Sequence, residues 1–161
     1  MDIRRAISAD ADAIRAIYNI EVTGSTATLD LVPRSAEEQA SWMASHSGVY
    51  PALVAELGGE VVGFASLSPY RPRPGYATAV EDSIYVAADH RGRGIGRQLL
   101  TEAVDTARDH GFHSVVARVS ATQPASVALH QACGFDFVGV EREIGRKFGR
   151  WIDVAILQLL L

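Results

Sequence analysis

The chain has 161 residues, of which 48% are hydrophobic and 21% are charged, and it contains one cysteine. This length and composition are typical of one compact globular domain, and we expect a single domain over residues 1–161. One cysteine excludes an internal disulfide framework and a thiolate metal cluster, and the net charge of −4 argues against general nucleic-acid binding.

The expected location of the protein is the cytoplasm. No stretch approaches the roughly 20 consecutive apolar residues that a membrane-spanning helix needs. Residues 1–5, Met-Asp-Ile-Arg-Arg, lack the apolar run of a signal peptide. We therefore expect neither a membrane nor a nucleic acid as a partner.

The first third of the chain predicts a strand, two helices and a loop between the helices. Residues 3–7 are typical of a short strand, and the Ser and Asp residues that follow can cap a helix. Residues 21–33 are irregular and rich in Thr, which is typical of a loop near a ligand. Ser35 and Glu38 form a capping-box pattern that predicts the start of a second short helix.

The middle of the chain predicts a hairpin and a further strand. Residues 52–57 and 61–67 are strand-like and are joined by Gly58-Gly59. Residues 68–75 contain three prolines and two arginines, which predicts a rigid loop. Residues 78–86 then predict another strand.

The last third predicts two helices among three strands. Apolar residues at helical spacing predict a helix from residue 95 to about residue 111. Strands are expected at 114–119, 137–142 and 151–160, with a helix at 124–132 that begins at a proline. Because strands and helices do not alternate strictly, we expect an α+β fold around one central mixed sheet.

A glycine-rich turn, His-Arg-Gly-Arg-Gly-Ile-Gly-Arg at residues 90–97, follows the strand before it and opens a helix. Its three glycines let the backbone approach a ligand closely. The helix that follows presents unpaired N–H groups and the positive end of its dipole. The turn contains three arginines and no acidic residue, and it therefore predicts a phosphate-binding site.

Two common nucleotide motifs do not fit this turn. A Walker loop would end in Gly-Lys-Ser/Thr, whereas Gly96 is followed by Arg97 and Gln98. A dinucleotide fingerprint would need its third glycine at position 97 or 99, where the chain has Arg97 and Leu99. A tight turn with solvated arginines remains the alternative to a ligand site.

The motif Arg91-x-x-Gly94-x-Gly96 after the strand at 83–86 resembles the acyl-CoA-binding motif of the GNAT superfamily of N-acetyltransferases. Residues 126–135 resemble the later helix-to-strand segment of that superfamily. The resemblance implies a central mixed, mostly antiparallel sheet flanked by helices, with a splayed strand pair at the acyl-CoA site. It also implies acetyl-CoA as cosubstrate and no metal.

The same resemblance implies which residues hold the cofactor. Backbone groups of the splayed strand would pair with the pantetheine arm, and the amides of the turn would hold the pyrophosphate. The residues implied are Ile84, Tyr85, Val86, Arg91, Gly92, Arg93, Gly94, Ile95, Gly96, Arg97 and Gln123. Relatives usually carry asparagine at the position of Gln123, which keeps the amide and adds a methylene group.

Further stretches resemble one branch, the phosphinothricin and methionine-sulfoximine acetyltransferases. They are residues 17–19, 25–28, 80–86 and 147–154. This resemblance implies direct transfer of the acetyl group to the amine of a small amino-acid-like acceptor. It also implies a homodimer, with the last stretch in a closing hairpin near the interface.

Glu81 matches the general base proposed for that branch. Acetyl transfer needs a neutral amine, whereas a free α-amine is mostly protonated at pH 7. A nearby carboxylate can remove that proton directly or through water. Asp82 is expected on the other side of the strand, which makes it the weaker candidate. A solvated carboxylate at the strand end is the alternative for Glu81.

Two further steps of the reaction also need groups from the protein. The backbone N–H of Val86 is the expected donor to the oxyanion of the tetrahedral intermediate. His130 stands where many relatives carry a tyrosine acid, so it is a candidate to protonate the CoA thiolate, with a structural histidine as the alternative. Cys133 is expected to be a small buried apolar residue rather than an acetyl carrier.

The acceptor site is implied to include the rigid loop and the strand that follows it. Arginine side chains can bind a carboxylate or phosphinate bidentately, although solvated loop arginines are the alternative. The implied acceptor contacts are Arg71, Pro72, Arg73, Glu81, Asp82 and Ser83. Competing functions are transfer to a polyamine, an aminoglycoside or a protein N-terminus, and a non-catalytic acyl-CoA-binding module.

Overall fold

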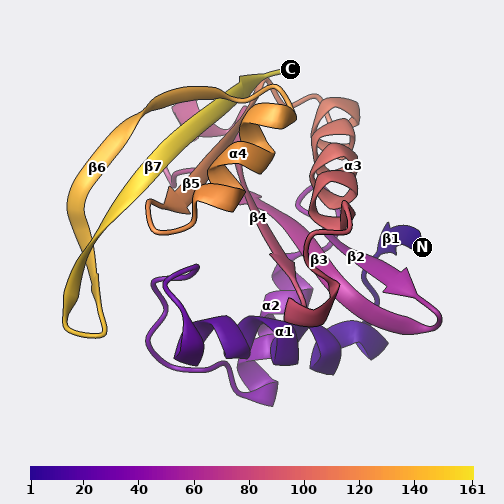
Figure 1. Cartoon of the computed structure of the whole chain (residues 1–161). Helices are drawn as coiled ribbons and strands as arrows, with labels where there is room; N and C mark the ends of the chain where they lie inside the picture. Colours follow the sequence, from indigo (N-terminus) through magenta and orange to yellow (C-terminus); the bar gives the residue numbers. More distant parts are fainter.

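The computed structural model describes residues 1–161 as one seven-stranded sheet covered by helices on both faces (Figure 1). The strands are β1 (Asp2–Arg5), β2 (Ala52–Leu57), β3 (Glu60–Pro69), β4 (Ala79–Val86), β5 (Ser114–Ser120), β6 (Asp136–Lys147) and β7 (Arg150–Leu160). The helices are α1 (Ala11–Gly24), α2 (Ala36–Ser45), α3 (Ile95–Asp109) and α4 (Pro124–Ala132). No helix is long and apolar enough to cross a membrane.

The sheet has the strand order β1-β2-β3-β4-β5-β7-β6 and is antiparallel except between β4 and β5. That parallel pairing ends at Asp82 and Ala117. Beyond it, β4 stays paired with β3 as far as Val86, and β5 stays paired with β7 as far as Ser120. The two central strands therefore splay apart, and the expected mixed sheet with a splayed strand pair is confirmed.

The two faces of the sheet have separate hydrophobic cores. Figure 1 shows α1 and α2 together on one side and α3 and α4 on the other. The larger core packs α3 against strand residues that include Val80 and Ala117, while the smaller core joins α1 to Phe64. Because side chains alternate along a strand, Ile84 packs against the first core and Tyr85 against the second. The splayed strands thus present different side chains to the two layers.

The local signals for the helices are mostly confirmed. The Ser35 hydroxyl accepts from the Glu38 N–H at 3.1 Å, and the Glu38 carboxylate accepts from the Ser35 N–H at 2.7 Å. The helix predicted at 124–132 has those bounds in the structure. The expected loop at 21–33 was wrong at its start, because α1 continues to Gly24. Val22 extends the apolar face of α1 into the core and so keeps this last turn helical.

The strand expected at 137–142 was too short, since β6 continues to Lys147. The register shifts between Glu141 and Gly145, and Glu143 has a positive φ of 52°. This irregularity removes the simple alternation of polar and apolar residues that marks a strand in a sequence.

The loop between α1 and α2 is held against the β6–β7 hairpin. Lys147 is buried, and its ammonium donates to the carbonyl oxygens of Thr28 at 2.7 Å and Glu21 at 3.3 Å. A Cβ atom at Gly145 would lie 2.5 Å from a methyl group of Leu29, so a larger residue there would require the Leu29 side chain to move. These contacts place the loop beside the open end of the splayed strands.

Candidate active site

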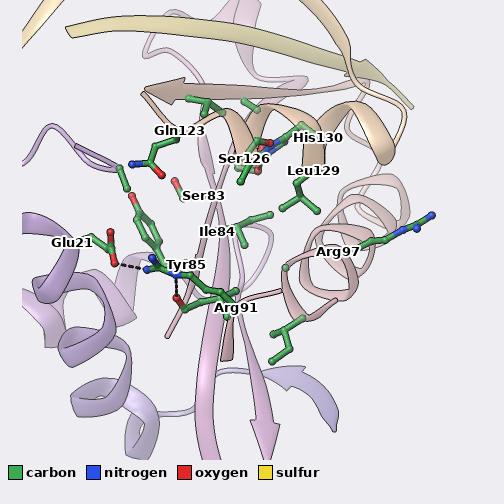
Figure 2. A pocket seen from close by; sticks show the side chains of 18 of the residues that line it. Glu21, Ser83, Ile84, Tyr85, Arg91, Arg97, Gln123, Ser126, Leu129 and His130 are labelled. Atoms are coloured by element: carbon green, nitrogen blue, oxygen red, sulfur yellow. Dashed lines mark hydrogen bonds and ion pairs between the residues drawn. The ribbon is translucent and has the colours of Figure 1, made fainter. Parts of the chain in front are cut away.

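A cavity of about 480 Å³ lies where β4 and β5 separate. Its walls come from the ends of both strands, the glycine-rich turn, the start of α3, and α4. Figure 2 shows Ile84 and Leu129 on one side of the cavity and Tyr85 and Glu21 on the other. Because the sheet has no hydrogen bonds between its strands here, a ligand can pass between the two layers of helices.

The glycine-rich turn has the backbone form of an anion site. Gly92 and Gly94 have φ values of 73° and 80°, a region that favours glycine. Gly94 is the N-cap of α3 and supplies no capping side chain, so the first N–H groups of the helix are left for a ligand. A Cβ atom at Gly96 would lie 3.2 Å from the side chain of Leu129, so this glycine also lets α3 approach α4 closely.

The arginines of the turn are placed differently from one another. Arg91 donates to the Glu21 carboxylate at 2.5 Å and to the carbonyl oxygen of Val86 at 2.9 Å (Figure 2). It therefore ties the turn to the end of α1 instead of pointing at the start of α3. Arg97 lines the cavity, but its side chain extends away from the others in Figure 2. Arg93 is exposed and lies outside the lining, so the backbone forms most of the cradle.

The open edge of β4 has backbone groups directed at the cavity. Ala87 donates its N–H to Val62 on β3 at 2.9 Å. Because successive residues of a strand point to opposite edges, the N–H groups of Val86 and Ile84 point toward the open edge. The cavity also includes Gln123 just before α4, whose side chain makes no capping hydrogen bond. An extended ligand with amide groups can thus pair with β4 as a further strand would.

His130 and Asp82 form a buried pair on the face of the sheet that carries α3 and α4. Nε2 of His130 lies 2.9 Å from Oδ2 of Asp82, and Nδ1 donates to the carbonyl oxygen of Ser126 at 2.7 Å. Burial lowers the pKa of His130, but the hydrogen bond and negative charge of Asp82 outweigh burial and leave the pKa raised. The other carboxylate oxygen, Oδ1, is buried with no partner in the protein. Sequence reasoning placed Asp82 near the acceptor and missed this pairing.

Glu81 lies on the opposite face from Asp82. It is half-buried, lies one residue before the pairing of β4 with β5 ends, and is not part of the cavity lining. Burial raises the pKa of Glu81, and the charges of Asp82 and Glu141 add to that effect, while Arg118 and Arg71 oppose it. The net result is a carboxylate that holds a proton more readily than an ordinary glutamate.

The loop arginines expected to contact the acceptor lie at the surface. Arg71, Pro72 and Arg73 are exposed and do not line the cavity, and the Arg71 guanidinium lies 5.0 Å from the ring centre of Tyr70. Ser83, in contrast, does line the cavity, as Figure 2 shows. Of the expected acceptor contacts, Asp82 and Ser83 line the cavity, whereas Glu81 and the three loop residues do not.

Arg118 lines the cavity and was missed by sequence reasoning. It lies on β5 beyond the point of splaying, and its Nη2 lies 2.7 Å from Oε2 of Glu141. One signal could have revealed it, namely a lone charge within the otherwise apolar or small run Ser-Val-Val-Ala-Arg-Val-Ser. A charged residue inside such a strand requires either a partner or a function.

Hydroxyl groups bridge the cleft between the α1–α2 loop and the turn after β5. The hydroxyl of Thr26 is hydrogen-bonded to that of Thr122, which lies 2.8 Å from the hydroxyl of Ser120. The bridge joins the layer of α1 to the end of β5.

The sequence that forms this cavity also matches a known protein family. The sequence profile of the acetyltransferase (GNAT) family matches residues 14–135. The chain belongs to the GNAT acetyltransferase family. The resemblance seen in the glycine-rich turn and in the segment after it is thereby confirmed.

Relatives and solved structures extend the match over the whole GNAT chain. An L-amino acid N-acyltransferase of Escherichia coli is 40% identical over 100% of this chain and 94% of its own length. An L-methionine sulfoximine/L-methionine sulfone acetyltransferase of Pseudomonas aeruginosa is 40% identical over 99% of this chain and 94% of its own. The crystal structure of a phosphinothricin acetyltransferase from Sinorhizobium meliloti, in complex with acetyl-CoA, has a TM-score of 0.96 and 39% identity, over 99% and 88% of the two chains.

Cys133 of this GNAT chain is not part of the cavity lining. Cys133 is partly buried next to α3 and α4, and burial raises the pKa of its thiol, which makes the reactive thiolate scarcer. No group of three or more His, Cys, Asp or Glu side chains comes together as a metal site would.

Proposed function

We propose that the protein transfers the acetyl group of acetyl-CoA to the α-amine of a small amino-acid-like acceptor, of the methionine sulfoximine, methionine sulfone or phosphinothricin type. The observation that carries the proposal is the splayed pair β4–β5, with a phosphate cradle on one face and Glu81 on the other. The names of the relatives from Escherichia coli, Pseudomonas aeruginosa and Sinorhizobium meliloti support the acceptor class.

Acetyl-CoA would enter from the face that carries α3 and α4. Its pyrophosphate would accept hydrogen bonds from the amides of the turn and of the first residues of α3. Its pantetheine arm would pair with the open edge of β4 at Ile84 and Val86, and Gln123 would add an amide contact. The thioester would then lie at the point of splaying.

The acceptor would bind on the face that carries α1 and α2, with Glu81 as its general base. Glu81 shares this face with Ser83 and Tyr85 because the three residues alternate with Asp82 and Ile84 along β4. A glutamate whose pKa is raised is a stronger base than an ordinary one. It would take the proton from the ammonium group so that the neutral amine can attack the thioester directly in a ternary complex.

The N–H of Val86 would donate to the oxyanion of the tetrahedral intermediate, because it points to the open edge of β4. His130 is the candidate acid for a later step, the protonation of the CoA thiolate. Both of its ring nitrogens are hydrogen-bonded within the protein, so it can give a proton to the CoA thiolate only by breaking its bond to Asp82. This arrangement favours the structural alternative, in which His130 fixes the carboxylate of Asp82 beside the donor.

We also propose a homodimer in the cytoplasm. The β6–β7 hairpin, which reaches outward in Figure 1, carries large apolar side chains that water reaches freely. They are Phe137, Val138, Val140, Ile144, Phe148 and Trp151. Several large exposed apolar side chains on one hairpin are typical of an association surface. Sedimentation equilibrium of the wild type and of Trp151→Arg is expected to show a dimer and a monomer respectively, and a wild-type monomer would contradict the proposal.

Release of free thiol from acetyl-CoA, measured with a panel of amines, tests the proposed function. We expect turnover with methionine sulfone, methionine sulfoximine and phosphinothricin, and little with spermidine, an aminoglycoside or a peptide N-terminus. A preference for one of the latter amines would replace the acceptor class. Binding of acetyl-CoA with no turnover for any amine would instead support a non-catalytic acyl-CoA-binding module.

A further inference from the structure

The end of β4 is held by the sheet along one edge only. Val86 is the last residue of β4 and lies beyond the point where β5 stops pairing with it. On the inner edge, the N–H of Ala87 donates to the carbonyl oxygen of Val62 on β3 at 2.9 Å. The N–H and the carbonyl of Val86 both point to the other edge, because these two groups of a strand residue share a direction. A strand end with one free edge moves easily unless another part of the protein holds that edge.

Arg91 supplies a contact on this open edge. The chain reverses in a short 3-10 turn at Ala88–His90, which brings Arg91 back beside the end of the strand. Its Nε donates to the carbonyl oxygen of Val86 at 2.9 Å, as Figure 2 shows. The peptide group that follows Val86 is thus hydrogen-bonded on both sides, through its carbonyl to Arg91 and through its N–H to β3. The N–H of Val86 itself is left pointing into the gap.

Glu21, near the end of α1, fixes the side chain of Arg91. Nη2 of Arg91 lies 2.5 Å from Oε1 of Glu21, and the other carboxylate oxygen accepts from the Ser25 hydroxyl at 2.5 Å. The side chain of Glu21 is only 9% exposed, whereas that of Arg91 is 52% exposed. A half-exposed arginine has many rotamers of similar energy, and a buried carboxylate at a fixed position selects one of them. The position of the β4 end therefore depends on a residue of a helix on the other side of the gap.

We propose that Glu21 is a positioning residue for acetyl transfer, which through Arg91 fixes the end of β4 and directs the N–H of Val86 at the thioester carbonyl. This inference rests on the proposed function, which assigns that N–H to the oxyanion of the tetrahedral intermediate. A donor stabilises an oxyanion only if it is already in place when the charge develops. Glu21 and Arg91 contribute to the reaction by holding the backbone, and neither exchanges a proton with a substrate.

The kinetic test is Glu21→Met, which keeps the length of the side chain and removes the acceptor for Arg91. We expect kcat to fall about 10-fold, a part of the roughly 10²- to 10³-fold that the loss of a whole oxyanion donor costs. The dissociation constant of acetyl-CoA and the KM for methionine sulfone should each change less than about threefold, since the oxyanion exists only after the substrates have bound. Glu21→Gln keeps one oxygen to accept from Arg91 and should recover most of kcat.

A double variant shows whether Glu21 acts through Arg91. Arg91→Met removes the bond to Val86 directly, and Glu21→Met added to it should lower kcat no further, because both changes break the same chain of contacts. Losses that multiply would mean that Glu21 acts by another route and would overturn the inference. A tenfold weaker binding of acetyl-CoA in either single variant would overturn it as well, since the pair would then serve the cofactor phosphates.

Glu56→Gln is the matched control for the loss of a carboxylate that pairs with an arginine. Glu56 lies on β2, away from the cavity, and is 2.8 Å from Arg4. Its kcat should equal that of the wild type. If Arg91→Met does not fold, the comparison of Glu21→Met with Glu21→Gln and with this control remains, and equal kcat in all three would overturn the inference.

Infrared spectroscopy of bound acetyl-CoA, isotopically labelled at its acetyl carbonyl carbon, tests the inference without any acceptor. A hydrogen bond to the carbonyl oxygen polarises the C=O bond, so the band should move to lower frequency on binding to the wild type. In Glu21→Met the band should lie closer to that of free acetyl-CoA, and in Glu56→Gln it should match the wild type. The same band in Glu21→Met and the wild type would overturn the inference, whereas a wrong acceptor class would show only in the thiol-release panel.

Discussion

At the splayed strands, the two faces of the sheet differ in the groups that they present to a ligand. The face with α3 and α4 is built from backbone, with a glycine turn, a free helix start and the open edge of β4. The face with α1 and α2 is built from charged side chains, among them Glu81, Arg118 and Glu141. Backbone groups suit a donor that is always the same, whereas side chains can be exchanged to fit different acceptors.

The largest expected effect comes from Glu81→Gln, which removes the proposed base and leaves the glycine-rich turn and the open edge of β4 unchanged. We expect kcat to fall about 10²-fold, because the amine must then lose its proton without help. The dissociation constant of acetyl-CoA, measured by calorimetry, should change less than about twofold. Glu37→Gln, on the exposed start of α2, is the matched control and should behave as the wild type. Unchanged turnover in Glu81→Gln would remove Glu81 as the base.

The pH dependence of kcat/KM also tests the assignment of Glu81 as the general base. Because burial raises the pKa of Glu81, the acidic limb of kcat/KM should have its midpoint above 4.5, the ordinary value for a glutamate. Activity should be lost as the pH falls through that midpoint, since the protonated carboxyl cannot accept the proton of the amine. Glu81→Gln should lack this limb, and a limb that persists in the variant would belong to another group.

Gly94→Val tests the role of the glycine-rich turn in binding acetyl-CoA without changing a charged side chain. A side chain at a φ of 80° strains the turn and disturbs the amides at the start of α3. We expect the dissociation constant of acetyl-CoA to rise about 30-fold, in keeping with the loss of a few charged hydrogen bonds. Gly58→Val, at a φ of 62° in the β2–β3 turn, imposes a similar strain away from the site. Equal donor affinity in the two variants would show that the turn does not hold the cofactor.

Asp82→Asn tests whether the buried pair is chiefly structural. Asp82 raises the pKa of His130 above the ordinary 6.5, so the pair stabilises the fold most below that pH and loses this contribution as the pH rises through the raised pKa. The variant should lose about 1–2 kcal/mol of unfolding free energy at pH 6 and less at pH 9, in urea titrations. A loss that is the same at both pH values would mean that His130 is neutral in the folded protein.

Arg71→Ala and Arg73→Ala are expected to have the smallest effects. Both side chains are exposed, and exposed charges are screened by salt. KM for methionine sulfone should rise less than about threefold in either variant. An increase of tenfold or more would show that the acceptor reaches this loop, and that the acceptor face extends further than the splayed strands.

The donor face could be predicted from the sequence because its signals are local. Gly92, Gly94 and Gly96 follow a strand and open a helix within a few residues, and that order alone indicates an anion site. The capping box at Ser35 and the proline at the start of α4 are equally local. Each of these signals depends on backbone conformation, which a short stretch of sequence determines.

The grouping of charged side chains on the face with α1 and α2 could not be predicted in the same way. Glu81, Arg118 and Glu141 lie on three different strands, and only the register of the sheet brings them together. The pairing of Asp82 with His130 likewise joins residues 48 positions apart. The resemblance implied that the Arg71–Arg73 loop contacts the acceptor, and the position of this loop outside the cavity lining is likewise a property of the tertiary structure.

The most direct test of the central claim is mass spectrometry of the products formed from acetyl-CoA and L-methionine sulfone, by the wild type and by Glu81→Gln under donor saturation. We predict N-acetylated methionine sulfone and an equal amount of free CoA from the wild type, and about 10²-fold slower formation of both by the variant. Saturable binding of acetyl-CoA without any N-acetylated amino acid would contradict the account.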